Sequence, residues 1–582
     1  MKKKGAGRIV VGISLLFFAV ITAGFLSTQE TRDFKIAKNL DVFFSLFREL
    51  NTFYVDEVNP DKVIKAGIDG MLGSLDPYTV YYSEADIDEF TFMTTGKYGG
   101  IGSLVRDNGD YTIISEVYKG FPADVAGIKA GDIMKKVDGA SLKGLASDKV
   151  SEHLKGDPGT KMVLTIERNG KESDFILTRE SVAIPPVPFY GMVDDRTGYI
   201  RFTNFTQNCI DDVKNALVTL KKEHNPQQVI LDLRGNPGGL LSEAVEIVNL
   251  FVSENNEVVS TKGKIKQYDA DYKTTKQPID DKIPLAVLIN RGSASASEIV
   301  AGAIQDLDRG VIIGQRSYGK GLVQVTRPLS YNTQLKVTTA KYYIPSGRCI
   351  QALDYEHMNP DGSVGTIPDS LISEFKTKNG RIVKDGGGIM PDVEVIPESL
   401  SQIATDLYMK NIIFDYATIY YWSHPEIKTI DQFNFADQDF NNFKDYLKTR
   451  KFTYNTTTED AFNELISTAK MEKYYDLHKD IFDQLAVDIA HNPEQDLLTF
   501  KKEITELLED EIIGRYFYQE GSIKWALKTD SQVKKAIEVL NNKDLYTSIL
   551  TGKSGNLLIV SNKNNAIYFD LKPPQQNNLV NL

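Results

Sequence analysis

The chain has 582 residues, of which 41% are hydrophobic and 25% are charged, and its formal net charge is −12. This is the composition of a globular protein with several domains. The acidic balance argues against nucleic acid as a partner, because phosphate binding needs clustered Lys and Arg. The two cysteines, Cys209 and Cys349, give no metal-ligand spacing and no disulfide framework. The sequence therefore predicts no metal and no cofactor.

The amino terminus has the pattern of an export signal. Three lysines within the first four residues and Arg8 precede an uncharged apolar run of 18 residues, 9–26. A basic segment followed by such a run is typical of a signal peptide or a membrane anchor. The excess of positive charge before the run predicts that the rest of the chain lies outside the cytoplasm. We therefore expect residues 1–30 to direct export, with membrane association through residues 9–26.

A helical region is expected next, over residues 31–97. Apolar residues recur at helical spacing within Phe43–Leu50 and again between Val63 and Leu72. Asp76-Pro77 then ends the pattern. The aromatic side chains of Phe43–Leu50 belong either to a core or to a contact between two copies of the chain, so a homodimer is one expectation.

Residues 98–180 change to short β segments. Thr112–Ile114 and Val163–Ile166 are typical of strands, and Asn169-Gly170 is a tight hairpin signal. Short helices are expected at Ala123–Ala126 and Ser147–Leu154. The segment therefore predicts a small β-barrel-like module.

An α/β core is predicted for residues 181–397, because strand and helix patterns alternate after the prolines at positions 185, 186 and 188. The expected strands are 198–202, 228–233 and 285–289, and the expected helices are 211–224, 242–251 and 297–306. Residues 398–582 form a helical extension of open role. Its helix candidates are Ile412–Trp422, Asp460–Lys473 and Asp496–Tyr516, and it contains no motif that carries chemistry.

The first candidate for chemistry is the serine-rich turn 290–299, which follows the apolar strand 285–289 and precedes a helix. Backbone N–H groups at the start of a helix are unpaired and suit an anion, including the oxyanion of a tetrahedral intermediate. Ser295 is the preferred nucleophile, with Ser293 and Ser297 as alternatives. Such a turn is also typical of a simple helix N-cap, and this segment alone favours that simpler interpretation.

A serine hydroxyl needs a base, and no histidine lies beside the candidate serines. Lys320 lies between two glycines in a turn that leads into a strand. Burial among apolar groups lowers the pKa of a lysine and allows it to act as a base. Gln324 is expected to accept a hydrogen bond from Lys320 and to orient it. A lone lysine in a turn is, however, usually exposed.

The third candidate is the turn 232–239, in which an apolar strand runs into Arg234-Gly235-Asn236-Pro237-Gly238-Gly239. Glycines at such a turn let the backbone approach a substrate closely. The N–H of Gly239 is therefore expected to form an oxyanion hole with that of Ala296. A phosphate-binding loop is disfavoured, because no lysine follows the glycines as in a nucleotide-binding loop.

Together these segments resemble the carboxyl-terminal processing proteases, also called tail-specific proteases. The family's lysine follows its serine by 25 residues, as Lys320 follows Ser295, and Gln324 matches a glutamine four residues further on. The stretch 71–79 and the stretch 342–348 are also similar to the family, although Cys349 stands where a serine is more usual. The resemblance implies a ClpP/crotonase-like α/β protease core with an inserted PDZ domain, an N-terminal helical region and a C-terminal helical extension.

The resemblance also implies a substrate and a location. A PDZ domain binds peptide carboxyl termini, and the segment similar to its carboxylate-binding loop consists of Tyr98, Gly99, Gly100, Ile101 and Gly102. The expected activity is that of a serine endopeptidase that uses a Ser-Lys dyad to cut exported proteins near their C-termini, and the expected substrates have free apolar C-termini. The expected location is the periplasmic face of the inner membrane or the cell envelope.

Two alternatives remain at this level. One is a catalytically inactive scaffold that only binds peptide termini. The other is a crotonase-like acyl-CoA enzyme, since the predicted α/β core is similar in style. Ser295, Lys320 and Gln324 argue against the first alternative, and the export signal together with the PDZ-like segment argues against the second.

Overall fold

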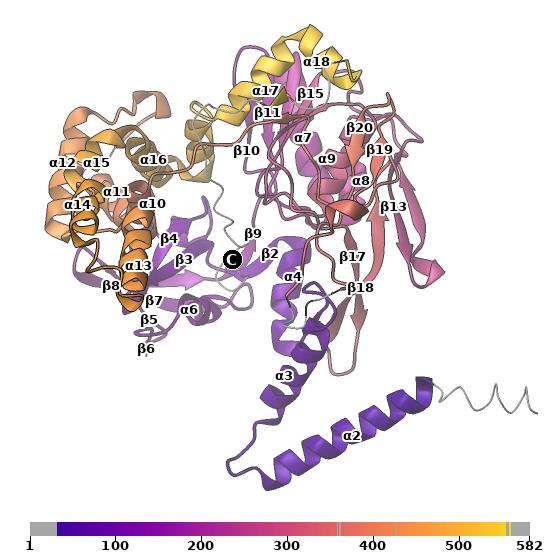
Figure 1. Cartoon of the computed structure of the whole chain (residues 1–582), viewed down its shortest axis with the longest axis horizontal. Helices are drawn as coiled ribbons and strands as arrows, with labels where there is room; N and C mark the ends of the chain where they lie inside the picture. Colours follow the sequence, from indigo (N-terminus) through magenta and orange to yellow (C-terminus); the bar gives the residue numbers. More distant parts are fainter. Residues whose placement is uncertain (1–31, 358, 360–362, 425, 554–557, 560–582) are drawn as a thin grey trace, which may run out of the picture. The chain divides into compact units, whose positions relative to one another are not determined.

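The computed structural model describes residues 32–553, except 358, 360–362 and 425, and also residues 558–559. The predicted membrane segment 9–26 lies outside this part of the chain. Within it, no helix is both long enough and apolar enough to cross a membrane. The chain divides into two compact units, one ending at Tyr81 and the other beginning at Tyr82 (Figure 1).

The first unit contains two helices, α2 (Arg32–Phe53) and α3 (Pro60–Gly73), and leads into the short strand β1 (Val80–Tyr82). Asn59 caps α3, because its side-chain oxygen accepts the N–H of Lys62 at 3.1 Å. Helix α2 buries none of its residues, and side chains such as Phe44 and Leu40 are exposed. The homodimer expected from this region stays a prediction.

The PDZ module follows the short helices η1 (Glu84–Asp86) and α4 (Ile87–Thr95). Its main sheet has the strand order β3-β4-β5-β7-β8, with β6 paired to β5, and β2 pairs with β9 in a second small sheet. The elements are β2 (Lys97–Gly100), β3 (Ser103–Asn108), β4 (Tyr111–Val117), α5 (Pro122–Val125), β5 (Ile133–Val137), β6 (Ala140–Ser141), α6 (Ser147–Leu154), β7 (Lys161–Arg168), β8 (Lys171–Thr178) and β9 (Glu180–Ala183). Strand β3 is an edge strand of the main sheet.

A seven-stranded sheet forms the α/β core, in the order β10-β11-β12-β15-β16-β21-β22. Strand β10 is antiparallel to β11, and the other neighbours are parallel. The strands are β10 (Phe189–Met192), β11 (Thr197–Arg201), β12 (Gln228–Asp232), β15 (Leu285–Ile289), β16 (Val311–Gly314), β21 (Val393–Glu394) and β22 (Leu558–Ile559).

Both faces of this sheet are buried, because alternate residues of each strand enter different apolar clusters. Leu231 and Val287 pack with helices α7 (Cys209–Glu223), α8 (Leu241–Asn249) and α9 (Ala296–Asp306). Their neighbours Ile230 and Leu288 pack on the other face with the C-terminal helices α17 (Ser531–Asn541) and α18 (Lys543–Leu550). Figure 1 shows these two helices in yellow beside β15.

A second sheet lies next to the core and contains β13, β14, β17 and β18. Its elements are β13 (Glu257–Gly263), η2 (Lys266–Tyr268), β14 (Ala270–Lys273), β17 (Leu322–Pro328) and β18 (Gln334–Tyr343). The segment after β18 adds η3 (Asp369–Leu371) and the hairpin β19 (Glu374–Lys376) and β20 (Ile382–Lys384). Lys320 lies two residues before strand β17.

The remaining helices form a bundle with its own apolar core. They are α10 (Gln402–Met409), α11 (Ile412–Ser423), η4 (Ile430–Gln432), α12 (Asp437–Arg450), α13 (Thr457–Met471), α14 (Lys479–Ile489), α15 (Pro493–Thr499) and α16 (Lys501–Ala526). The expected single helix over Asp496–Tyr516 is wrong, because the chain breaks at Phe500 between α15 and α16. Helix α16 itself is interrupted at Tyr518, which has a φ of 57°.

The architecture predicted from the sequence is confirmed: a mixed α/β chain with a small β module, an α/β core and C-terminal helices. The C-terminal extension has two parts that pack in different places. Residues 402–526 build the helical bundle, whereas α17 and α18 cover one face of the core sheet.

Candidate active site

Ser295 stands at the junction between strand β15 and helix α9, where the sequence predicts the nucleophile. Its φ is 54° and its ψ is −113°, a left-handed conformation that costs a non-glycine residue free energy. Although Ser295 occupies the N-cap position, its side chain makes no capping hydrogen bond to the helix. Ser295 is therefore the N-cap residue of a capping box in which Glu298 accepts its backbone N–H, and the strained turn presents a half-buried hydroxyl.

The two alternative serines use their hydroxyls structurally. Ser293 Oγ donates to the carbonyl of Leu233 at 2.8 Å, and Ser297 Oγ donates to the carbonyl of Asn236 at 2.9 Å. Both residues are fully buried. Since a nucleophile needs an accessible hydroxyl, Ser295 is the best candidate of the three.

The carboxylate of Glu298 joins the serine turn to the lysine turn. It is fully buried and accepts hydrogen bonds from the backbone N–H groups of Ser295 (2.8 Å) and Lys320 (2.9 Å), both at Oε2. Its Oε1 accepts the N–H of Gly319 at 2.7 Å and the hydroxyl of Ser317 at 2.5 Å. Burial raises the pKa of Glu298 to about 7, while the four donors act in the opposite direction.

Lys320 is half-buried two residues before β17, and its backbone N–H is fixed by Glu298. A further bond between the two turns comes from the N–H of Tyr318, which donates to the carbonyl of Ser293 at 3.0 Å. Gln324 lies on β17, where its Nε2 donates to Thr338 Oγ1 at 3.1 Å. The structure thus brings the backbone N–H groups of Ser295 and Lys320 to one carboxylate.

The turn 235–239 packs directly against Ser295. Gly238 has a φ of +97°, and a Cβ atom on it would lie 2.9 Å from the Cβ of Ser295. Gly239 lies against Phe205, whose N–H donates to the carbonyl of Gly238 at 3.0 Å. Within the described part of the chain, no acceptor is recorded for the N–H groups of Ala296 and Gly239. Two donors of this kind beside a serine can stabilise an oxyanion.

The predicted carboxylate-binding loop lies at the start of the PDZ edge strand, but only part of it is a loop. Tyr98, Gly99 and Gly100 belong to β2 and pair with β9. Ile101 is buried, and Gly102, with a φ of +75°, leads into β3. The carbonyls of Ile101 and Gly102 accept the N–H groups of Ala123 and Tyr118, each at 2.9 Å. The open edge of β3 suits the addition of a peptide strand.

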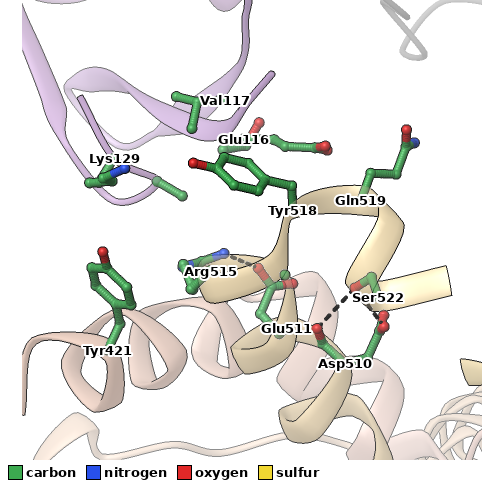
Figure 2. A pocket seen from close by; sticks show the side chains of 13 residues that line it. Glu116, Val117, Lys129, Tyr421, Asp510, Glu511, Arg515, Tyr518, Gln519 and Ser522 are labelled. Atoms are coloured by element: carbon green, nitrogen blue, oxygen red, sulfur yellow. Dashed lines mark hydrogen bonds and ion pairs between the residues drawn. The ribbon is translucent and has the colours of Figure 1, made fainter. Parts of the chain in front are cut away.

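A separate cavity of about 210 Å³ lies where the PDZ domain meets the helical bundle. Figure 2 shows Glu116 and Lys129 of the PDZ domain facing Arg515 and Tyr518 of α16. Burial and the charge of Glu511 raise the pKa of Glu116 to about 7. No residue of the serine or lysine turn lines this cavity, so it marks a contact between domains rather than the place of bond cleavage.

Glu298 lies within the serine-rich turn 290–299, and the sequence alone predicts no role for it. The Ser-x-x-Glu spacing is that of a capping box, in which the glutamate reaches back to the N–H of the serine. This pattern could have identified the bond to Ser295. The bonds to the lysine turn could not be found in this way, because they span 19 to 22 residues and depend on the fold.

Three family models match the chain, one each in the α/β core, the PDZ segment and the C-terminal helices. Residues 196–369 match the model of peptidase family S41, and residues 99–178 match the PDZ domain model. Residues 403–540 match the model "Probable PDZ-protease, C-terminal helical domain". None of the three models describes an acyl-CoA enzyme.

Individual relatives agree with this result. The chain is 35% identical over 371 residues to a carboxy-terminal-processing protease of Bartonella bacilliformis, a match that covers 63% of this chain and 82% of the relative. It is 30% identical over 450 residues to a probable CtpA-like serine protease of Staphylococcus aureus strain N315, covering 77% and 84%. Among solved structures, the photosystem II D1 C-terminal processing protease is 27% identical, with a TM-score of 0.35 and coverage of 64% and 96%. The chain therefore belongs to the carboxy-terminal-processing proteases, serine-type peptidases of family S41 that carry a PDZ domain.

Proposed function

We propose that the chain is a serine endopeptidase in which Ser295 is the nucleophile and Lys320 is the general base. The observation that carries the proposal is the shared carboxylate of Glu298, which accepts the backbone N–H groups of both residues. The strained backbone and the half-buried position of Ser295 also support the proposal, since Ser293 and Ser297 use their hydroxyls elsewhere.

The reaction is an acyl transfer in two steps. The neutral amine of Lys320 accepts the proton of Ser295 as Oγ attacks the peptide carbonyl. The N–H groups of Ala296 and Gly239 stabilise the oxyanion. The intermediate expels the amine, which takes the proton from Lys320, and water then hydrolyses the acyl-enzyme with Lys320 again as the base. Gln324 orients the amine of Lys320.

The PDZ domain is proposed to select substrates by their free carboxyl termini. The terminal carboxylate would bind at Gly100–Gly102 while the peptide adds to the open edge of β3. The substrates are exported proteins, and the enzyme is held at the periplasmic face of the membrane through residues 9–26. The basic residues before this apolar run support the proposal.

Tail recognition can be tested with one unstructured protein substrate in two forms. One form ends in a free apolar residue, and the other carries the same residue as an amide. We expect kcat/KM to be about 10- to 100-fold lower for the amide, because charge-assisted hydrogen bonds to the carboxylate contribute about 1.5–3 kcal/mol. Equal rates would exclude tail recognition and leave the peptidase proposal intact. Failure to cleave either form would contradict the peptidase proposal.

A further inference from the structure

The C-terminal helix α17 begins next to the active-site turn. Asp530 caps this helix, because its Oδ1 accepts the N–H groups of Gln532 and Val533, each at 2.9 Å. The other oxygen of Asp530 forms an ion pair with Arg234 at 2.7 Å. Gln532 is buried and accepts a hydrogen bond from the same Arg234 nitrogen at 3.0 Å. Two residues of the C-terminal extension therefore hold one arginine of the protease core.

Arg234 is fixed on its other side by Asp232. The Nε and Nη2 atoms of Arg234 donate to this carboxylate at 3.0 and 2.6 Å, and Arg201 pairs with it at 2.9 Å. Asp232 is fully buried, and the two guanidinium groups hold its pKa at about 2. A mostly buried arginine with these partners has one stable position only if all of them remain in place.

The position of Arg234 matters because the turn 235–239 follows it directly. Within this turn, the carbonyl of Asn236 accepts the N–H of Ala294 at 3.0 Å, and the side chain of Asn236 accepts the N–H of Gly238 at 2.9 Å. Gly238 has no room for a side chain next to Ser295. Arg234 is therefore joined through the backbone to a turn that contacts the serine turn.

We infer that Asp530 and Gln532 are positioning residues for the peptidase reaction. They hold Arg234, and through it they hold the turn that presents the N–H of Gly239 beside Ser295. The helical extension thus completes the active site from the far end of the chain, although it supplies no group that touches the substrate. This inference rests on the proposed function of Ser295 and Gly239.

The test uses the full-length protein with Asp530→Asn. Asparagine still caps a helix, so α17 keeps its start, but the negative charge facing Arg234 is lost. We expect kcat for a peptide substrate to fall about 10- to 100-fold, because small displacements of oxyanion donors have effects of this size. KM is expected to change less than about threefold, since substrate binding does not use this turn before the transition state.

A second readout separates positioning from stability. A peptide aldehyde forms a tetrahedral adduct with the serine, and its affinity is expected to fall by the same factor as kcat/KM, while the affinity for an uncleaved product peptide stays constant. The matched control is Asn541→Ala at the other end of α17, which removes a 3.1 Å hydrogen bond to Gln228. This control is expected to lower the melting temperature without changing kcat.

Unchanged kcat in Asp530→Asn would overturn the inference, and so would an equal loss of kcat in Asn541→Ala. Ser295→Ala distinguishes a failure of the positioning role from a failure of the proposed function. If Ser295→Ala is inactive while Asp530→Asn behaves as wild type, only the positioning role fails. If Ser295→Ala cleaves as wild type, the proposed function itself fails.

Discussion

Ser295→Ala is expected to lower kcat/KM for peptide cleavage at least about 1,000-fold, because no other described hydroxyl in the turn can replace the nucleophile. The substitution removes a half-buried hydroxyl that makes no capping bond, so the melting temperature should change little. Cleavage of a quenched fluorescent peptide and a thermal melt measure the two effects. Wild-type cleavage by this variant would contradict the proposed mechanism.

Ser293→Ala is the matched control, since it deletes a hydroxyl from the same turn. Ser293 donates to the carbonyl of Leu233 and accepts the N–H of Asn290 at 3.0 Å. Its loss should therefore cost about 1–3 kcal/mol of stability, because buried backbone groups lose their partner. The variant should still cleave peptides at a temperature at which it is folded. The two variants thus separate the chemical role of a hydroxyl from its structural role.

Glu298→Gln is expected to lower kcat/KM at least about 100-fold and to reduce stability. The glutamine side chain has one acceptor oxygen where glutamate has two. Its NH2 group is a donor and cannot accept the hydrogen bonds that the replaced oxygen accepted. If the nitrogen replaces Oε2, it opposes the N–H groups of Ser295 and Lys320. If it replaces Oε1, it opposes the N–H group of Gly319 and the hydroxyl of Ser317. Either arrangement should cost about 2–5 kcal/mol of folding free energy.

Ser317→Ala serves as the control for Glu298, because it removes only one of the four donors to the same carboxylate. Its effect on kcat/KM should be clearly smaller, at most about tenfold. The comparison is made with steady-state kinetics and chemical unfolding of both variants. Wild-type kinetics in Glu298→Gln would show that the shared carboxylate does not position the pair.

Local patterns in the sequence were sufficient for much of the core. The apolar run 228–233 predicts a strand, and β12 covers Gln228–Asp232. The helix expected at 242–251 corresponds to α8, Leu241–Asn249. These elements follow from residues close together in the chain, because strands of a buried parallel sheet are continuous apolar runs that end at Gly and Pro.

Other features depend on contacts between distant segments and were not predictable. The apolar residues Val533, Ala536 and Leu540 indicate an amphipathic helix, but they do not identify the sheet face that α17 covers. The ion pair between Arg234 and Asp530 also joins segments that are far apart in the sequence, so it could not be predicted either. Pairing with β9 places Tyr98, Gly99 and Gly100 in β2 rather than in a loop, and the role of segment 98–102 in carboxylate binding stays a prediction.

The candidate site shows the same division. Ser295, Lys320, Ala296 and Gly239 were predicted from motifs, and the structure brings the serine turn together with the lysine turn and with the glycine turn. The element that joins the first two, the Glu298 carboxylate, was assigned no role, because a buried acid with four donors is a property of the folded chain. Its contribution follows from geometry alone.

The central claim is that Lys320 activates Ser295, and covalent labelling tests it most directly. A fluorophosphonate reacts with an activated serine, and mass spectrometry of the digested protein locates the adduct. We predict an adduct on Ser295 in the wild type and labelling at least about 1,000-fold slower in Lys320→Ala, while Lys341→Ala, which removes an exposed pair with Glu356, reacts as wild type. An adduct on another residue, or equal labelling of Ser295 in Lys320→Ala, would contradict the account.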